Sequence, residues 1–206
     1  MDRRRRVAAA YLSAWTLLVG LFGCGAGLHT GHKFAIPGPE DQFLEKSKGV
    51  LAVREGVAVA CAAQNEIKDA DVFYLILFNG TNEFLEFDAS KVRLLDQSGK
   101  AHKPLSRQQR VAKFGARYTP KPPIGVSGDI FRASRAVSSF GDVVSPLNPN
   151  ELFQAKVMPG SRTAFFVYFP PKSIESSRLT LVVPGIRLGS SQKELTFVFP
   201  FEVQRK

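Results

Sequence analysis

The pattern that most constrains the fold is a regular alternation of apolar side chains close to the C-terminus, over residues 195–203. Side chains that repeat every two residues lie on one face of a β-strand, so this run predicts a half-buried strand. The apolar face carries Leu195, Phe197, Phe199, Phe201 and Val203. Pro200, on the other face, has no backbone N–H for a sheet hydrogen bond, which predicts an edge position or a bulge there.

Several other short apolar runs are separated by turns, as strands are. Residues 72–79 are apolar on both faces, which is typical of a central strand in a sandwich. Asn79 and Gly80 end this run and predict a tight hairpin to residues 83–87. Asn79, Gly80 and Thr81 also form a glycosylation sequon, and we favour the turn. A second hairpin is predicted around residues 97–99. The remaining runs cover residues 50–54, 57–64, 91–96, 100–104, 163–169 and 179–183.

These runs amount to about seven or eight short strands with little helix between them. We therefore expect an all-β fold, namely an immunoglobulin-like antiparallel β-sandwich over residues 50–206. A short helical or loop insertion is expected at residues 105–157, where no strand pattern is found. A connection of this length is usually either functional or disordered.

A short helix is expected at the start of this insertion. Ser106, followed three residues later by Gln109, matches a capping box, and Gly115 is placed as a C-terminal cap. These signals predict a helix from Arg107 to Phe114. Apolar residues on the helix are expected to form one edge of it.

The same segment is strongly basic, because no acidic residue lies between Asp96 and Asp129. At 100° per residue, Arg110, Lys113 and Arg117 fall on one side of the helix. One interpretation is a contact with anionic lipid headgroups or with an acidic partner. The other, which we favour, is a solvated helix whose apolar edge, Val111 and Phe114, packs on the sandwich. The candidate contact residues are Arg107, Arg110, Lys113, Arg117 and Lys121.

The N-terminal segment has the features of a secretion signal. Arginines at residues 3–6 precede an uncharged run at residues 7–28. An uncleaved membrane anchor is one interpretation, since about 20 apolar residues span a bilayer. Glycines crowd the end of the run, however, and leave only residues 7–19 as a well-formed apolar helix. Ordinary cleavage near Ala26, without a lipid, is another alternative.

The segment Leu21-Phe22-Gly23-Cys24 resembles the lipobox of bacterial lipoproteins, although Phe22 is bulkier than is usual at its position. The resemblance implies a signal peptide at residues 1–23 and a diacylglyceryl thioether on Cys24. Two acyl chains hold a protein stably at a membrane, so the implied location is the bacterial cell envelope. By analogy with lipoprotein sorting, Gly25 favours the outer membrane, facing the periplasm or the surface.

Two further expectations concern the chain after Cys24. Glycines and prolines punctuate residues 24–49, which predicts a flexible tether between the lipid and the domain. The placement of turns ahead of residues 164–170 is similar to that in small immunoglobulin-like domains of bacterial surface lipoproteins. The predicted organisation is therefore a signal peptide, a tether and one sandwich domain.

No motif in residues 50–206 indicates catalysis. His102 is the only histidine there, and the sequence has no Gly-x-Ser-x-Gly elbow, phosphate loop or Cys/His zinc cluster. Cys61 lies among small apolar residues and is expected to be buried. Glu86 and Asp88 share one strand face and are expected to face solvent. We therefore expect no enzyme activity, no cofactor and no metal site.

A lipid anchor, a tether and a sandwich without catalytic residues predict a non-enzymatic envelope protein. Such a protein would bind another envelope protein or support an envelope assembly. The alternative is a carrier of a small apolar ligand, a lipid or an ion, with the insertion as its lid. The net charge of +10 identifies no specific partner, and a location outside the cytoplasm argues against nucleic acid.

Overall fold

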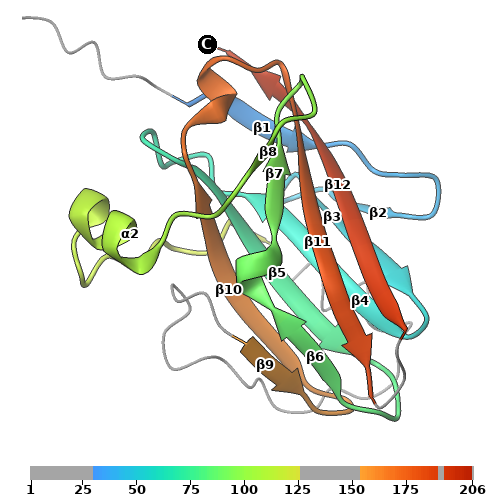
Figure 1. Cartoon of the computed structure of the whole chain (residues 1–206). Coiled ribbons are helices and arrows are strands. Elements are labelled where there is room, and N and C mark those ends of the chain that lie inside the picture. The colour runs from blue at the N-terminus through green and yellow to red at the C-terminus, as the bar shows by residue number, and fades with distance from the viewer. Residues whose placement is uncertain (1–29, 126–153, 190–192, 206) are drawn as a thin grey trace, which may run out of the picture.

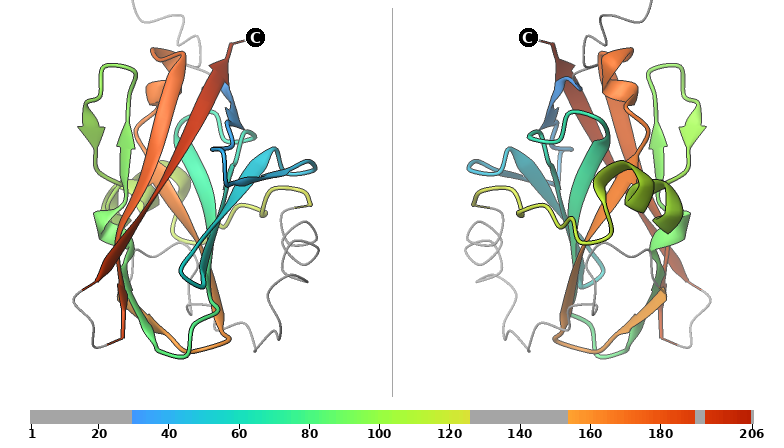
Figure 2. Two further views of the ribbon diagram at one scale, coloured as in Figure 1. Left: turned by 90° about the vertical axis from the view of Figure 1, so that its right-hand side faces the viewer. Right: turned by 90° about the vertical axis from the view of Figure 1, so that its left-hand side faces the viewer.

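The computed structural model describes residues 30–125, 154–189 and 193–205 of the chain. These residues form two antiparallel β-sheets that pack face to face, with one α-helix on the outside (Figure 1 and Figure 2). The chain is therefore an all-β sandwich, as expected. The described residues contain twelve strands, however, rather than seven or eight.

The first sheet joins the N-terminal and C-terminal strands. Its members are β1 (His32–Ala35), β6 (Leu85–Asp88), β7 (Arg93–Leu95), β8 (Ala101–His102), β9 (Gln154–Val157), β11 (Arg178–Leu188) and β12 (Glu194–Gln204). Their order is β1-β12-β11-β6-β9. β7 also pairs with β11, at residues 180–182, whereas β6 pairs with it at residues 187 and 188. β7 and β8 form the hairpin that was predicted around residues 97–99.

The second sheet is built around its longest buried strand. Its members are β2 (Gln42–Leu44), β3 (Gly49–Arg54), β4 (Val57–Ala63), β5 (Asp71–Asn79) and β10 (Arg162–Phe169). Their order is β10-β5-β4-β3-β2, and all nine residues of β5 are buried. The prediction of a central strand at residues 72–79 is therefore confirmed.

Aromatic side chains fill the space between the two sheets. The ring of Phe73 in β5 lies 5.0 Å from that of Phe201 in β12, measured between centroids. The rings of Phe87 in β6 and Phe165 in β10 lie 5.3 Å apart. Burial of one such side chain contributes about 1.5–3 kcal/mol relative to its exposure. The alternation predicted for residues 195–203 is confirmed, because every second side chain of β12 faces this core.

Pro200 marks neither an edge strand nor a bulge, contrary to the prediction, because β12 lies between β1 and β11 and its residues 197–202 pair with β11 in continuous register. The carbonyl of Pro200 accepts a hydrogen bond from the N–H of Ile36 at 2.8 Å. In a strand, the N and O of one residue point to the same side, so the nitrogen of Pro200 also faces the β1 side. β1 ends at Ala35, opposite Phe201. The proline therefore lies just past the end of the neighbouring ladder, where its missing N–H is tolerated.

The predicted hairpin at Asn79 and Gly80 is also wrong, because β5 and β6 belong to different sheets. The chain crosses between the sheets at this point, and the side chain of Asn79 stabilises the crossing. Its Nδ2 donates to the carbonyls of Glu83 at 2.7 Å and Val157 at 2.8 Å, and its Oδ1 accepts from the N–H of Thr81 at 3.0 Å. Asn79 is fully buried, so the sequon amide is inaccessible in the folded chain.

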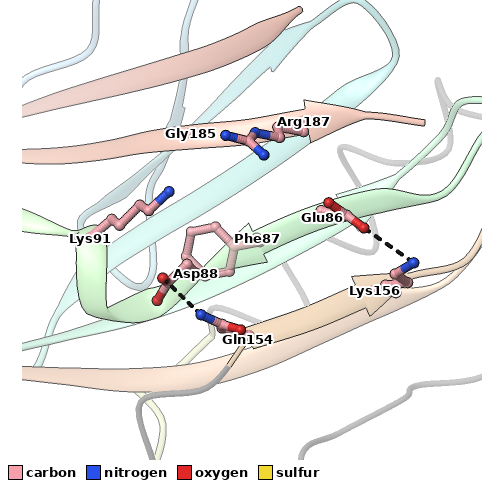
Figure 3. Close-up of a pocket in the computed structure, with 8 residues that line it drawn as sticks. All are labelled: Glu86, Phe87, Asp88, Lys91, Gln154, Lys156, Gly185 and Arg187. Atoms are coloured by element: carbon pink, nitrogen blue, oxygen red, sulfur yellow. Dashed lines mark hydrogen bonds and ion pairs between the residues drawn. The ribbon is translucent and has the colours of Figure 1, made fainter. Parts of the chain in front are cut away.

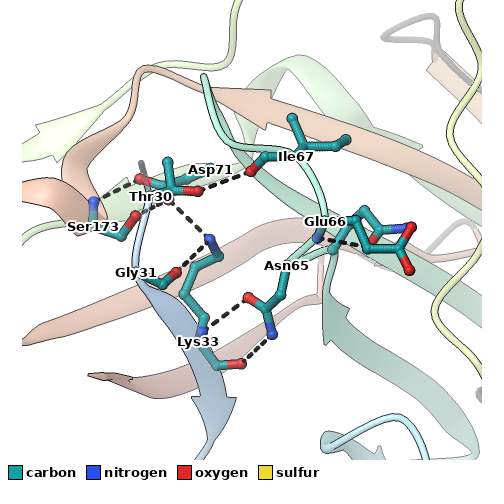
Figure 4. A network of polar contacts seen from close by, with 9 residues as sticks. Thr30, Gly31, Lys33, Asn65, Glu66, Ile67, Asp71 and Ser173 are labelled. Carbon is teal, nitrogen blue, oxygen red and sulfur yellow. Dashed lines mark hydrogen bonds and ion pairs between the residues drawn. The ribbon is translucent and has the colours of Figure 1, made fainter. Parts of the chain in front are cut away.

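The described part of the expected tether, residues 30–49, belongs to the sandwich and is not a tether. Thr30 Oγ1 donates to the carbonyl of Ile67 at 2.8 Å (Figure 4). The side chain of Asn65 bonds to both the backbone N–H and the carbonyl of Lys33, at 2.9 Å and 3.1 Å. The glycines and prolines of this segment therefore separate strands rather than loosen the chain. Residues 24–29 lie outside the described residues.

The predicted helix is confirmed as α2 (Arg107–Phe114), with both halves of its capping box. Ser106 Oγ accepts from the N–H of Gln109 at 3.3 Å, and Gln109 Oε1 accepts from the N–H of Ser106 at 2.9 Å. Gly115 ends the helix with a φ of +87°. The surrounding insertion is not free of strands, because β9 lies within residues 105–157. Residues 126–153 of the insertion are outside the described part of the chain.

Candidate functional site

A pocket of about 360 Å³ opens on the first sheet, among β6, β9 and β11 (Figure 3). It is also bordered by η1 (Ala89–Lys91), the 3-10 turn between β6 and β7. The pocket is within the size range of small-molecule sites, which is about 300–1,000 Å³. Its lining consists of Glu86, Phe87, Asp88, Lys91, Gln154, Lys156, Gly185 and Arg187.

An interruption in the ladder of β11 creates this pocket. β6 pairs with β11 at Arg187 and Leu188, whereas β7 pairs with it only at residues 180–182. Between them β11 is irregular, and Gly185 has a φ of +69°, which favours glycine. Bulges of this kind are common beside functional sites, because they break the pairing and redirect side chains.

Carboxylates occupy the β6 side of the pocket. Glu86 Oε1 lies 3.2 Å from the Nζ of Lys156 in β9. Asp88 Oδ2 accepts from Gln154 Nε2 at 3.3 Å, and its Oδ1 accepts from the N–H and hydroxyl of Ser90. Desolvation raises the pKa of Asp88, but these hydrogen bonds and the charge of Lys91 outweigh it and hold the pKa below its ordinary value. Asp88 therefore carries its charge into the acid range.

Cations occupy the opposite side, next to Gly185. Arg187 Nε donates to Glu194 Oε1 at 2.7 Å. This hydrogen bond and the attraction of the two charges raise the pKa of Arg187 and lower that of Glu194. Lys91 extends over Gly185, whose added Cβ would lie 3.9 Å from the Lys91 Nζ. Among the residues that the structure describes, Lys91 forms no ion pair.

The basic residues predicted as a contact surface are not all exposed. Arg107, Lys113, Arg117 and Lys121 are exposed, but Arg110 is buried, with 8% of its surface accessible. Its guanidinium lies 5.3 Å from the ring of Tyr168 in β10, an arrangement that favours a cation–π contact. The prediction that Arg110 faces outward is therefore wrong.

Arg110 is buried because it lies on the face of α2 that packs against the sheet. Phe114 packs on Tyr168, with 5.7 Å between ring centroids. Arg110 lies one turn before Phe114 and shares its face of the helix, so it is buried with it. Val111, expected to pack on the sandwich, is 39% exposed. The favoured interpretation of a helix packed on the sandwich thus holds for Phe114 but not for Val111.

Of the other residues considered from sequence, Cys24 lies outside the described residues. Cys61 is fully buried, and burial raises the pKa of its thiol well above the ordinary value. His102 is half-buried, with its Nε2 2.8 Å from Asp96 Oδ2. Neither the thiol nor the imidazole lines the pocket on the first sheet.

Of the residues that line this pocket, only Glu86 and Asp88 were considered from the sequence, as a solvent-facing pair, and in the structure both are half-buried. The cations Lys91, Lys156 and Arg187 were not predicted, because they come from three separate segments. The one local signal was the Pro-Gly pair within the strand run after residue 178, since an isolated glycine in a strand indicates a bulge.

Within residues 30–125, 154–189 and 193–205, no group of three His, Cys, Asp or Glu residues is arranged to hold a metal ion. In the same ranges, no helix has the length and apolar character needed to cross a membrane. Comparison with protein-family models gives no match, and a search of curated proteins finds no similar sequence. The structure thus defines an all-β sandwich with a charged pocket on one sheet.

Proposed function

We propose that this chain is a non-enzymatic, lipid-anchored protein of the bacterial cell envelope, and that its sandwich binds another envelope component at the pocket among β6, β9 and β11. The lipobox at Leu21-Phe22-Gly23-Cys24 supports the anchor. A charged, concave site supports a binding role, because such a site offers polar groups that orient a ligand.

The observation that carries this proposal is the position of the pocket relative to the start of the fold. β1, the first strand, pairs with residues 201–204 of β12. Arg187 of the pocket pairs with Glu194, at the other end of the same strand. Ten residues of strand separate the two ends by roughly 33 Å. In Figure 1, β1 lies at the end of the sandwich opposite β9. A chain anchored through its N-terminus would therefore present the pocket away from the membrane.

The anchor is tested by changing Cys24 to Ala in the full chain. The proposal expects the variant to remain unprocessed or to leave the membrane fraction, and to incorporate no labelled fatty acid. Cys61→Ala is the matched control and is expected to be labelled as the wild type is. Absence of label from the wild-type chain would overturn the anchor.

The binding role is tested by photo-cross-linking in intact cells. A cross-linking amino acid at Lys156, beside the pocket, is expected to capture one discrete component that the same amino acid at Lys113, on α2, does not capture. Equal capture at both positions, or none at Lys156, would contradict binding at the pocket.

The alternative function is a carrier of a small apolar ligand, a lipid or an ion, and the described residues give no support to an apolar ligand or a lipid. The hollow beside α2, between Arg107 and Tyr168, has a volume of about 50 Å³. That is much smaller than the roughly 300 Å³ of the smallest usual ligand sites. The larger pocket on the first sheet is lined mainly by charged side chains and is unsuited to an apolar ligand.

A further inference from the structure

We propose that the pocket among β6, β9 and β11 binds a small zwitterion, namely a free amino acid or a short peptide with both termini free. This inference rests on the proposed function and names the chemistry that the pocket recognises. In Figure 3, the cations Lys91 and Arg187 lie on the Gly185 side, and the carboxylates of Glu86 and Asp88 lie on the β6 side.

The cationic side of the pocket has hydrogen-bond donors that the described contacts do not use. The guanidinium of Arg187 carries five N–H donors, and among the described contacts only its Nε is used, by Glu194. The remaining donors suit a carboxylate, which an arginine side chain binds through two parallel hydrogen bonds. Lys91 brings a second positive charge to the same side of Gly185. A ligand carboxylate is therefore placed between Lys91 and Arg187.

The carboxylates on the anionic side have hydrogen-bond acceptor positions that the described contacts do not use. An ionised carboxylate offers about four lone-pair positions. In the described contacts Glu86 uses one for Lys156, and the Oδ2 of Asp88 uses one, at 3.3 Å, for Gln154. The lowered pKa of Asp88 keeps its charge in place at neutral pH. A ligand ammonium, with its three donors, is therefore placed next to β6.

Because the pocket carries charges of both signs, a zwitterion suits it better than a simple anion or cation does. Three cations, Lys91, Lys156 and Arg187, and two carboxylates line the pocket; Lys156 pairs with Glu86, and Arg187 pairs with Glu194. An anion would gain energy at one side and lose it at the other, and so would a cation. A molecule that carries both charges gains at both sides, because unlike charges then meet at each end.

The experiment compares three probes of nearly equal size by NMR titration of the isotope-labelled full chain, with the fold of each sample checked by its spectrum. The probes are dialanine, N-acetyl-dialanine and dialanine amide. We expect dialanine to shift the amide signals of residues 86–88 and 185–187. Each blocked probe should bind at least roughly tenfold more weakly, because it loses one charged hydrogen-bonding group. A fourth probe, free alanine, separates an amino-acid site from a peptide site.

Amino-acid substitutions test whether dialanine binds at this pocket. Lys91→Ala removes a charge that has no ion pair among the described residues, and it should weaken dialanine binding several-fold while leaving the fold intact. Arg187→Gln should weaken it further. Lys113→Ala, on the exposed side of α2, is the matched control and should bind as the wild type does. Equal binding of all three dipeptides, no shift at millimolar dialanine, or an unchanged affinity in Lys91→Ala would each overturn the proposal.

These outcomes are separable from those of the proposed function. A failure of dialanine to bind would overturn the zwitterion site but would leave fatty-acid labelling of Cys24 and cross-linking from Lys156 unaffected. Conversely, loss of the cross-link with dialanine binding retained would overturn the envelope partner while the small-molecule site stood.

Discussion

The ammonium of Lys33 lies 3.2 Å from Asp71 Oδ1, and neither side chain is exposed to solvent. The pair joins β1 of the first sheet to β5 of the second (Figure 4). Asp71 also accepts hydrogen bonds from the N–H and hydroxyl of Ser173, and Lys33 Nζ donates to the carbonyl of Gly31. Desolvation lowers the pKa of Lys33, and the charge and hydrogen bond of Asp71 only partly offset this effect.

Lys33→Met is expected to destabilise the domain by about 3–5 kcal/mol, because it leaves the charge of Asp71 buried without its partner. Urea unfolding, followed by circular dichroism, measures the change. The matched control is Lys48→Met, since Lys48 lies 3.9 Å from Glu45 in an exposed pair. Exposed pairs contribute at most about 1 kcal/mol. A loss in Lys33→Met no larger than that of the control would contradict the structural role of the pair.

Asn79→Ala is expected to cost about 2–3 kcal/mol, because the carbonyls of Glu83 and Val157 then lose their buried donor. Chemical denaturation measures the loss. Asn82→Ala, at an exposed position three residues later, should change the free energy of unfolding by less than about 0.5 kcal/mol. If the two variants were equally stable, the crossing between the sheets would not depend on Asn79.

Ser106→Ala is expected to weaken α2 by about 1 kcal/mol, because the N–H of Gln109 loses its capping acceptor. The effect should be local, so hydrogen exchange of the amides in α2 is the suitable measurement. Faster exchange is expected there and not in β5. Gln108→Ala, an exposed substitution on the same helix, should leave exchange nearly unchanged, and a similar acceleration in both variants would argue against the cap.

The β7–β8 hairpin is expected to loosen at low pH. A hydrogen bond from the hydroxyl of Ser98, followed by one from His102, holds the pKa of Asp96 well below its ordinary value of 3.8. A carboxylate whose pKa is lowered on folding stabilises the fold above its unfolded pKa, and this contribution is lost as the pH falls through the folded pKa. NMR titration of the Asp96 carboxyl and of the hairpin amides should show both changes below pH 3.8. Asp96→Asn should remove this pH dependence, and a carboxyl that titrates at 3.8 or above would contradict it.

Cys61 is expected to resist thiol reagents in the folded protein. It is fully buried in β4, and its raised pKa keeps it in the unreactive thiol form. In the Cys24→Ala variant, where Cys61 is the only remaining cysteine, a thiol reagent should label little in native buffer and label completely in denaturant. Rapid labelling of the native variant would show that β4 opens readily.

Features that depend on neighbouring residues were predictable from the sequence. The alternation over residues 195–203 defined β12, the apolar run at residues 72–79 defined the central β5, and the pair Ser106 and Gln109 placed α2. Each is a local signal, because side-chain periodicity and helix capping involve residues within a few positions of one another. The all-β class followed from the number of such strands.

The tertiary structure decided which strands pair and what their side chains meet. Asn79 and Gly80 have the local form of a hairpin turn, yet the chain crosses there to the other sheet. Lys33 lies in a segment whose glycines and prolines predicted a tether, yet it is buried against Asp71. The free energy of burying both sheet faces outweighs such local preferences, since packing depends on segments far apart in the chain. The charged pocket arises in the same way, because its residues come together only when β6, β9 and β11 pair.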